Sequence, residues 1–203
     1  MKIKRVILIH GFNVSDGGAG TTDKLRSPIE ELGIEVIEFD TKWKRGLIRD
    51  LISVRMDNGK RARRLASMLK EGDLLIGHSN GCAIIDLACW QLASFDNAPK
   101  VACLYLNAAL DKDAPIAPQV AAQWVFHTES DRTVGVAAKL FGSHWGSQGR
   151  DGYKGDEDSR AVSFTYEHHG ILNPEHSGIF HHENGINVIM FRVKTLIQYL
   201  ETI

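Results

Sequence analysis

The segment LLIGHSNGCAII, residues 74–85, decides the fold because its character changes at its middle. Three apolar residues, typical of a buried strand, lead into GHSNG (residues 77–81), after which apolar residues return at a looser, helical spacing. Gly-x-Ser-x-Gly between a strand and a helix is the pattern of a nucleophile elbow, a sharp turn that exposes the serine hydroxyl. Gly77 and Gly81 would keep side chains out of the place where the helix passes close to the strand. The segment therefore predicts a strand, an exposed Ser79 and a helix.

Strand and helix patterns alternate along the rest of the chain. Apolar, β-branched runs predict strands at residues 4–11, 34–40, 73–79, 100–108, 123–130 and 161–169. Helical spacing predicts helices from Thr22 or Asp23, as the capping residue, to about residue 33, and at residues 59–71, 81–95, 134–141 and 186–200. This alternation favours an α/β three-layer sandwich, with a mostly parallel six-stranded sheet and helices on both faces.

The length and composition are those of one globular domain. The 203 residues are 43% hydrophobic and 24% charged, with a mean hydropathy of −0.17, which argues against the disordered and membrane classes. We expect a single domain over residues 1–203, with a glycine-rich surface loop at about 142–160. The first apolar run, residues 6–9, is too short for a signal peptide or a membrane span, so we expect a cytoplasmic protein without a transmembrane segment.

Three cysteines, Cys82, Cys89 and Cys103, lie in apolar segments. We expect them to be reduced core residues, as is usual in a reducing compartment. A helix would place Cys82 and Cys89 two turns apart, roughly 10 Å, which is beyond the reach of a disulfide.

Charge is unevenly distributed, although the formal net charge is only −1. This balance argues against a protein that coats nucleic acid. Between residues 42 and 64, however, nine basic residues stand against Asp50 and Asp57. A solvated helix face explains such a cluster, and the alternative is an anionic partner such as a phosphate-bearing substrate, an acidic membrane surface or RNA.

A serine nucleophile needs a general base, and the base needs an acid that orients it. In this architecture the acid precedes the histidine in the sequence, and each follows a later strand. Asp131, directly after the strand predicted at 123–130, is the favoured acid. Its rivals are Glu129 and, after the fourth predicted strand, Asp111 and Asp113.

The favoured base is His176, in the segment EHHGILNPEHSGIF that follows the last predicted strand. Small residues follow it directly, and Ile179 and Phe180 could anchor the loop while the ring stays accessible. The other histidines of this region and the two that flank the serine remain alternatives: His168, His169, His181, His182, His10 and His78.

The negative oxygen of a tetrahedral intermediate needs hydrogen-bond donors. The backbone N–H of Asn80, next after the serine, and that of Phe12, after the first strand, are the predicted pair. The positive end of the following helix would add to the same effect.

Four segments, VILIHGFN, LIGHSNG, TESDRTV and EHSGIF, in this order and spacing, resemble the α/β-hydrolase superfamily over residues 6–180. The resemblance implies a catalytic triad of Ser79, Asp131 and His176, with an oxyanion hole formed by the backbones of Phe12 and Asn80.

Known relatives are mostly esterases, lipases, cutinases and thioesterases. This chain lacks room for the first two antiparallel strands of the larger members, and only about fifteen residues, 108–122, stand where many lipases insert a lid. It is similar to a minimal lipase- or cutinase-like form with an open site, although cutinases are typically secreted and disulfide-bonded.

Other kinds of site fit the sequence less well. The C-terminal histidines do not have the i, i+4 spacing usual for zinc ligands, and the glycine and terminal glutamate of a calcium loop are out of place in residues 151–158. Neither G-x-G-x-x-G nor G-x-x-x-x-G-K-[ST] matches the glycines after the first strand.

The sequence therefore predicts a serine hydrolase of carboxylic esters or thioesters that forms an acyl-enzyme on Ser79. Its expected partner is a small-molecule ester, and it would require no cofactor or metal. The alternatives are a non-catalytic binding protein on the same scaffold and a metal-dependent hydrolase that uses the C-terminal histidines.

Overall fold

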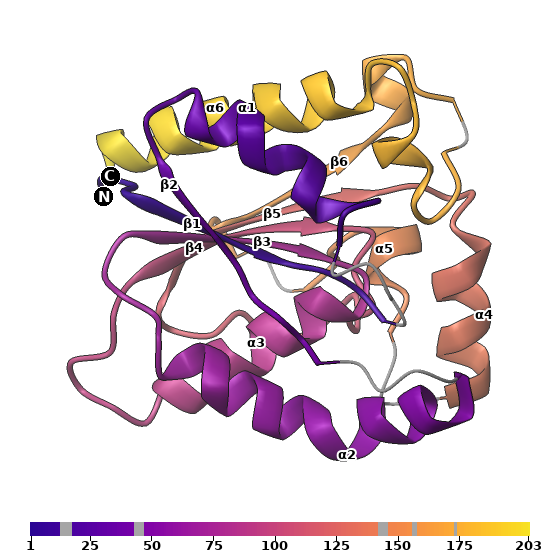
Figure 1. Cartoon of the computed structure of the whole chain (residues 1–203), viewed down its shortest axis with the longest axis horizontal. Helices are drawn as coiled ribbons and strands as arrows, with labels where there is room; N and C mark the ends of the chain where they lie inside the picture. The colour runs from indigo at the N-terminus through magenta and orange to yellow at the C-terminus, as the bar shows by residue number, and fades with distance from the viewer. Residues whose placement is uncertain (13–17, 43–46, 142–145, 156–157, 173) are drawn as a thin grey trace.

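A single six-stranded sheet runs through the centre of the computed structural model, which describes residues 1–12, 18–42, 47–141, 146–155, 158–172 and 174–203 (Figure 1). Its strands are β1 (Arg5–Ile9), β2 (Glu35–Glu38), β3 (Asp73–His78), β4 (Val101–Leu106), β5 (Val120–His127) and β6 (Ala161–Thr165). They lie in the order β2-β1-β3-β4-β5-β6, and every neighbouring pair is parallel. The predicted six-stranded α/β architecture is confirmed, and the sheet is parallel throughout.

Helices cover both faces of this sheet (Figure 1). The α-helices are α1 (Arg26–Glu30), α2 (Leu47–Ala66), α3 (Asn80–Leu92), α4 (Arg132–Phe141), α5 (Gln148–Asp151) and α6 (Gly185–Thr202), and the 3-10 helices are η1 (Thr22–Leu25), η3 (Glu167–His169) and η4 (Gly178–Phe180). Helices α1 and α6 lie on one face, and α2 and α3 on the other. None of the helices in the described part of the chain has the length and apolar character needed to cross a membrane.

The alternation of side chains along the strands divides the core into two layers. Val6 and Leu8 of β1 point into the layer under α1 and α6, whereas Ile7 and Ile9 point into the layer under α2 and α3. Strands β1, β3 and β4 are buried along their whole length, which explains their continuous apolar sequence. The three cysteines are free and buried in the second layer.

Several predicted boundaries are wrong. The helix predicted at 59–71 is α2, which begins at Leu47 and ends at Ala66. Glycine is a poor helix former, but packing against α3 carries the helix through Gly59. Gly72, the predicted stop, instead adopts a left-handed φ of 81° just before β3.

The other predicted helix and strand boundaries differ less from the structure. The predicted capping residues, Thr22 and Asp23, lie within η1, where the preceding residue makes no side-chain capping hydrogen bond. Strand β5 begins three residues earlier than predicted, and β6 ends at Thr165, where η3 soon follows.

The glycine-rich region at 142–160 is not only a surface loop, because it contains α5. Gly149 of this helix is buried so closely against the end of β4 that a Cβ there would lie 2.4 Å from the carbonyl carbon of Asn107. Residues 142–145 and 156–157 lie outside the described residues.

Candidate active site

Ser79 occupies the turn between β3 and α3 with a backbone that few residues other than glycine adopt. Its φ of 55° and ψ of −125° lie outside the regions open to most L-residues. Neighbouring backbone fixes this conformation: the Ser79 N–H donates to Leu106 O (3.0 Å), and Ser79 O accepts from the N–H groups of Cys82 (3.1 Å) and Ala109 (3.2 Å). The sharp turn predicted from the Gly-x-Ser-x-Gly segment is present.

The two glycines of the motif are sterically required. A Cβ at Gly77 would lie 2.7 Å from Ile85 Cδ1, and a Cβ at Gly81 would lie 2.3 Å from Ile9 O. The turn also touches the segment after β1, because a Cβ at Gly11 would lie 2.9 Å from Ser79 Cβ. The backbone that follows β1 therefore runs directly against the serine.

Asp131 and His176 form a hydrogen-bonded pair. Asp131 is fully buried at the start of α4, and its Oδ2 lies 2.8 Å from His176 Nδ1. Its Oδ1 accepts from the Val134 N–H (2.9 Å). Burial acts to raise the pKa of Asp131, but the hydrogen bond and charge of His176, with the Val134 and Asn107 donors, hold it below its ordinary value. A carboxylate at this position makes Nδ1 the donor, which leaves Nε2 of the neutral ring as an acceptor.

His176 lies beside the strand end that carries the serine. The rings of His176 and His78 are 4.8 Å apart between centroids, and His78 Nε2 lies 3.1 Å from His176 O. Within the described part of the chain, Ser79 Oγ makes no hydrogen bond with the ring of His176 or with any other group. The three predicted residues thus lie at the carboxyl end of the sheet. Asp131 and His176 are hydrogen-bonded, and the ring of His176 lies against His78, which directly precedes Ser79.

The loops that carry the pair are also joined to each other. Ser130 Oγ donates to Pro174 O (2.9 Å), and Thr128 Oγ1 donates to Glu167 Oε1 (2.7 Å). These bonds hold the segment before His176 against the segment before Asp131.

Asn107, at the end of β4, is a site residue that sequence reasoning missed. It is fully buried, has a left-handed φ of 50°, and donates from Nδ2 to Asp131 Oδ2 (2.9 Å). Its Oδ1 accepts from the hydroxyl of buried Tyr166 (2.7 Å), whose ring stacks on Phe126. Asp131 Oδ2 therefore has two fixed donors, His176 and Asn107.

His78 was considered only as an alternative base. It is buried, and its pKa falls to about 3, because of burial first and then the nearby His176. A ring that remains neutral and donates from Nε2 to the His176 carbonyl serves to position that segment. Its other nitrogen, Nδ1, is buried and has no hydrogen-bond partner within the described residues.

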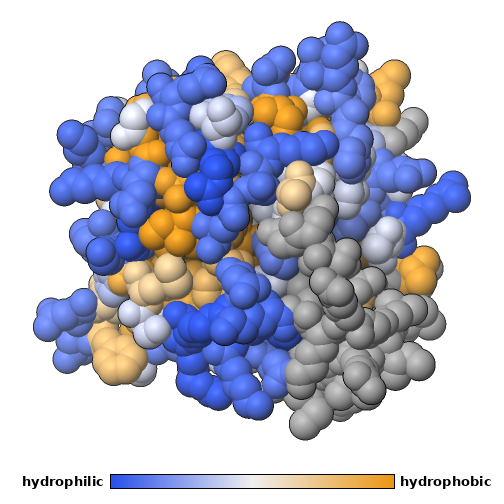
Figure 2. Space-filling model, viewed as in Figure 1, coloured by the Kyte–Doolittle hydropathy of each residue, from blue (hydrophilic) through white to orange (hydrophobic). Residues whose placement is uncertain are grey.

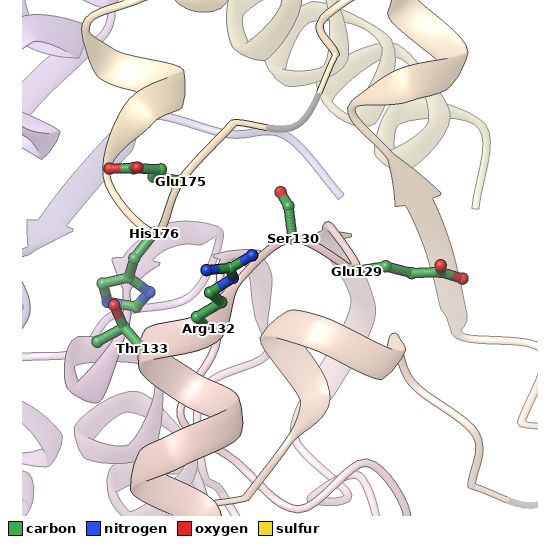
Figure 3. Close-up of a pocket in the computed structure, with 6 residues that line it drawn as sticks. All are labelled: Glu129, Ser130, Arg132, Thr133, Glu175 and His176. Atoms are coloured by element: carbon green, nitrogen blue, oxygen red, sulfur yellow. The ribbon is translucent and has the colours of Figure 1, made fainter.

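The alternative candidates for the acid and the base contact other groups or point away from the site. The carboxylate of Glu129 points away from His176 (Figure 3), and Asp111 Oδ1 accepts from the Asp113 N–H. Four of the remaining candidate histidines contact separate groups: His169 contacts Arg192, His181 contacts Lys24, His182 accepts from the Asn184 N–H and His10 contacts Thr41. His168 is exposed in η3. Among the described residues, no three His, Cys, Asp or Glu side chains are grouped as metal ligands would be.

A cavity of about 820 Å³ opens beside His176 (Figure 3). Its lining is polar: Glu129, Ser130, Arg132, Thr133, Glu175 and His176. In this view the Arg132 guanidinium lies between His176 and Ser130, and the carboxylates of Glu129 and Glu175 point outward on opposite sides.

The predicted oxyanion donors, Asn80 and Phe12, lie on the two chain segments that meet at Ser79. Asn80 is the first residue of α3, so no carbonyl of an earlier helical turn accepts from its backbone N–H. Phe12 follows Gly11, the residue that lies against Ser79.

Comparison with solved structures identifies the architecture. Mouse alpha/beta hydrolase domain-containing protein 10 superposes with a TM-score of 0.60 at 13% identity, over 98% of this chain and 92% of its own. A Xanthomonas campestris pv. campestris protein of the alpha/beta hydrolase superfamily gives a TM-score of 0.55 at 18% identity, over 98% and 99%. The chain has the α/β-hydrolase fold.

A longer protein matches only in part. Aspergillus fumigatus lipase B gives a TM-score of 0.55 at 12% identity, and the match covers 88% of this chain but 49% of the lipase. No family model and no curated protein sequence matches the chain. The predicted α/β-hydrolase fold is therefore confirmed.

Proposed function

We propose that the protein is a serine hydrolase that cleaves carboxylic esters or thioesters through an acyl-enzyme on Ser79. The observation that carries this proposal is the Asp131–His176 hydrogen bond beside a serine held in a strained strand-to-helix turn. Strain of this kind persists only where the surrounding structure enforces it, and it is concentrated at functional sites. The neighbours named above include an α/β hydrolase domain protein and a lipase.

In the proposed reaction, Ser79 Oγ attacks the acyl carbon while His176 Nε2 takes the hydroxyl proton. The backbone N–H groups of Asn80 and Phe12 hold the negative oxygen of the tetrahedral intermediate. The bond to the leaving alcohol or thiol then breaks as His176 returns the proton to it. Water, deprotonated in turn by His176, attacks the acyl-enzyme, and the second intermediate releases the acid and restores Ser79.

The proposal requires Ser79 Oγ and His176 Nε2 to come within hydrogen-bond distance. Rotation about the Ser79 Cα–Cβ bond moves Oγ without disturbing the backbone. Catalytic hydrogen bonds of this kind are often long before substrate binds and shorten in the complex.

Activity on p-nitrophenyl esters of increasing acyl length tests the proposed class. We expect turnover that is unaffected by a metal chelator, with an optimum chain length that defines the acyl pocket. Loss of activity on chelation would favour the metal-dependent alternative. A folded protein that binds esters but does not turn them over would favour the binding-protein alternative.

Asn107 offers a test of how the acid is held. In the variant Asn107→Asp, two carboxyl groups would stand about 3 Å apart, so they would share a proton and the pKa of the pair would rise. Because Asp131 must be anionic to orient His176, we expect kcat at pH 7 to fall about 10- to 100-fold and to recover as the pH rises.

The measurement is kcat against pH, with Asn97→Asp, an exposed site, as the matched control. Tyr166→Phe, which removes one donor to Asn107, should cause a smaller loss without the recovery at high pH. An Asn107→Asp profile parallel to the wild type would show that Asn107 does not control the acid.

A further inference from the structure

The basic cluster noted in the sequence forms a pocket on the face opposite α1 and α6. The pocket encloses about 340 Å³ between the segment after β2 and the second half of α2. Four cations and one carboxylate line it, together with a hydroxyl: Lys42, Lys60, Arg61, Arg64, Asp57 and Thr41. Figure 2 shows hydrophilic side chains gathered over this half of α2, at the bottom of the view.

The positive charge of this pocket is only partly neutralised. Lys60 Nζ lies 3.2 Å from Asp57 Oδ1 and its side chain is 72% exposed, so this ion pair is weak. The Arg64 guanidinium lies 4.5 Å over the ring of Phe39, which orients it without cancelling its charge. Within the part of the chain that the structure describes, neither Lys42 nor Arg64 forms an ion pair.

The back of the pocket is fixed by a buried arginine. Arg61 is only 7% exposed, and its Nε donates to Thr41 O (2.6 Å). Thr41 Oγ1 in turn lies 3.0 Å from His10 Nε2. The Arg61 guanidinium is therefore already held in place, so little ordering of this side chain would be needed to bind a ligand.

The buried residues behind the pocket are connected to the turn that holds the serine. The side chains of Asn58 and Asn80 exchange two hydrogen bonds, Asn58 Nδ2 to Asn80 Oδ1 (3.0 Å) and Asn80 Nδ2 to Asn58 Oδ1 (3.3 Å). Asn58 follows the pocket residue Asp57, and Asn80 follows Ser79. His10 precedes Gly11, which lies against Ser79. Two short connections thus join the pocket to the candidate active site.

We propose that this pocket binds a carboxylate or phosphate group, carried by the far end of the ester substrate or by a separate small anion. A net positive charge concentrated in a concavity attracts such groups, and guanidinium donors bind their oxygens well. The inference rests on the proposed function only for the substrate-borne case. The remaining basic residues of the cluster, at 44, 45, 49, 55 and 63, are not needed for it.

The test uses the double variant Lys60→Gln/Arg64→Gln, which leaves the buried Arg61 in place. The control variant, Lys4→Gln/Lys194→Gln, removes two exposed cations elsewhere. The first measurement is calorimetric titration of each protein with inorganic phosphate. We expect the wild type and the control to bind phosphate, and binding to weaken about tenfold in the pocket variant because one or two charge-assisted hydrogen bonds are lost.

The second measurement separates the two sources of the anion. Mono-p-nitrophenyl esters of dicarboxylic acids from succinate to suberate are compared with uncharged p-nitrophenyl esters of matching length. If the group belongs to the substrate, kcat/KM for the charged ester exceeds that for the uncharged one at some chain length, and the pocket variant loses this preference by about three- to tenfold. If phosphate binds but no preference is found, the ligand is a separate small anion.

The proposal would be overturned if all three proteins bind phosphate equally, or if none of them binds it, and if kcat/KM shows no preference for the charged esters. Failure of the proposed function gives a different result, because the phosphate titration does not depend on turnover. A protein that hydrolyses no ester but loses phosphate binding in the pocket variant would retain the anion site and lose only the hydrolase assignment.

Discussion

Replacing Ser79 with alanine is expected to lower kcat on a p-nitrophenyl ester by about 10⁴- to 10⁶-fold, with little change in thermal stability. The loss is large because the covalent route disappears when the nucleophilic oxygen is removed. Stability should hold because Ser79 Oγ makes no hydrogen bond within the described residues, and because the bonds that fix the turn are made by backbone groups. Steady-state kinetics and a thermal unfolding curve measure both effects.

Ser94→Ala is a suitable control for this variant, since Ser94 is exposed just after the other end of α3. Ser79→Cys keeps a nucleophile at the turn and should retain more activity than Ser79→Ala on activated esters. Equal activity of Ser79→Ala and the wild type would exclude an acyl-enzyme on Ser79.

Asp131→Asn is expected to give the second largest loss, about 10⁴-fold in kcat near neutral pH. The carboxylate Oδ2 accepts from His176 Nδ1, so it selects the ring tautomer whose Nε2 is free to take a proton. An amide placed there can donate to Nδ1 instead, which favours the tautomer with a proton on Nε2. Asparagine has nearly the same size and shape as aspartate, so the thermal unfolding temperature should change far less than kcat.

Glu129→Gln is the matched control, because Glu129 is two residues away and was the nearest rival for the acid. Kinetics of both variants on the same ester decide between the two carboxyl groups. A large loss in Glu129→Gln with a small one in Asp131→Asn would assign the acid to Glu129.

Strong local patterns made the sheet and its sharp turn predictable. Apolar runs marked β1, β3 and β4, because these strands are buried on both faces, and the glycines at 77 and 81 marked the turn. The same order of segments predicted which carboxyl and which imidazole would meet, and the structure brings Asp131 and His176 together.

Tertiary contacts determine the features that the sequence did not reveal. Asn107 was assigned to the end of a strand, and the only local signal of its role was an asparagine, a residue that tolerates positive φ, directly after a buried run. Tyr166 was assigned to a strand, and nothing in its neighbourhood indicated that its hydroxyl would reach Asn107 across 59 positions. Likewise, α5 has too few residues and too many glycines to show helical spacing, and packing against β4 and β5 stabilises it.

Labelling with a fluorophosphonate tests the central claim most directly, because this reagent reacts with a serine hydroxyl that an adjacent base activates. The account predicts one label per protein molecule, located by mass spectrometry on the peptide that contains Ser79, no labelling of Ser79→Ala and much slower labelling of Asp131→Asn. A folded wild-type protein that takes up no label, or that carries it on another residue, would contradict the account.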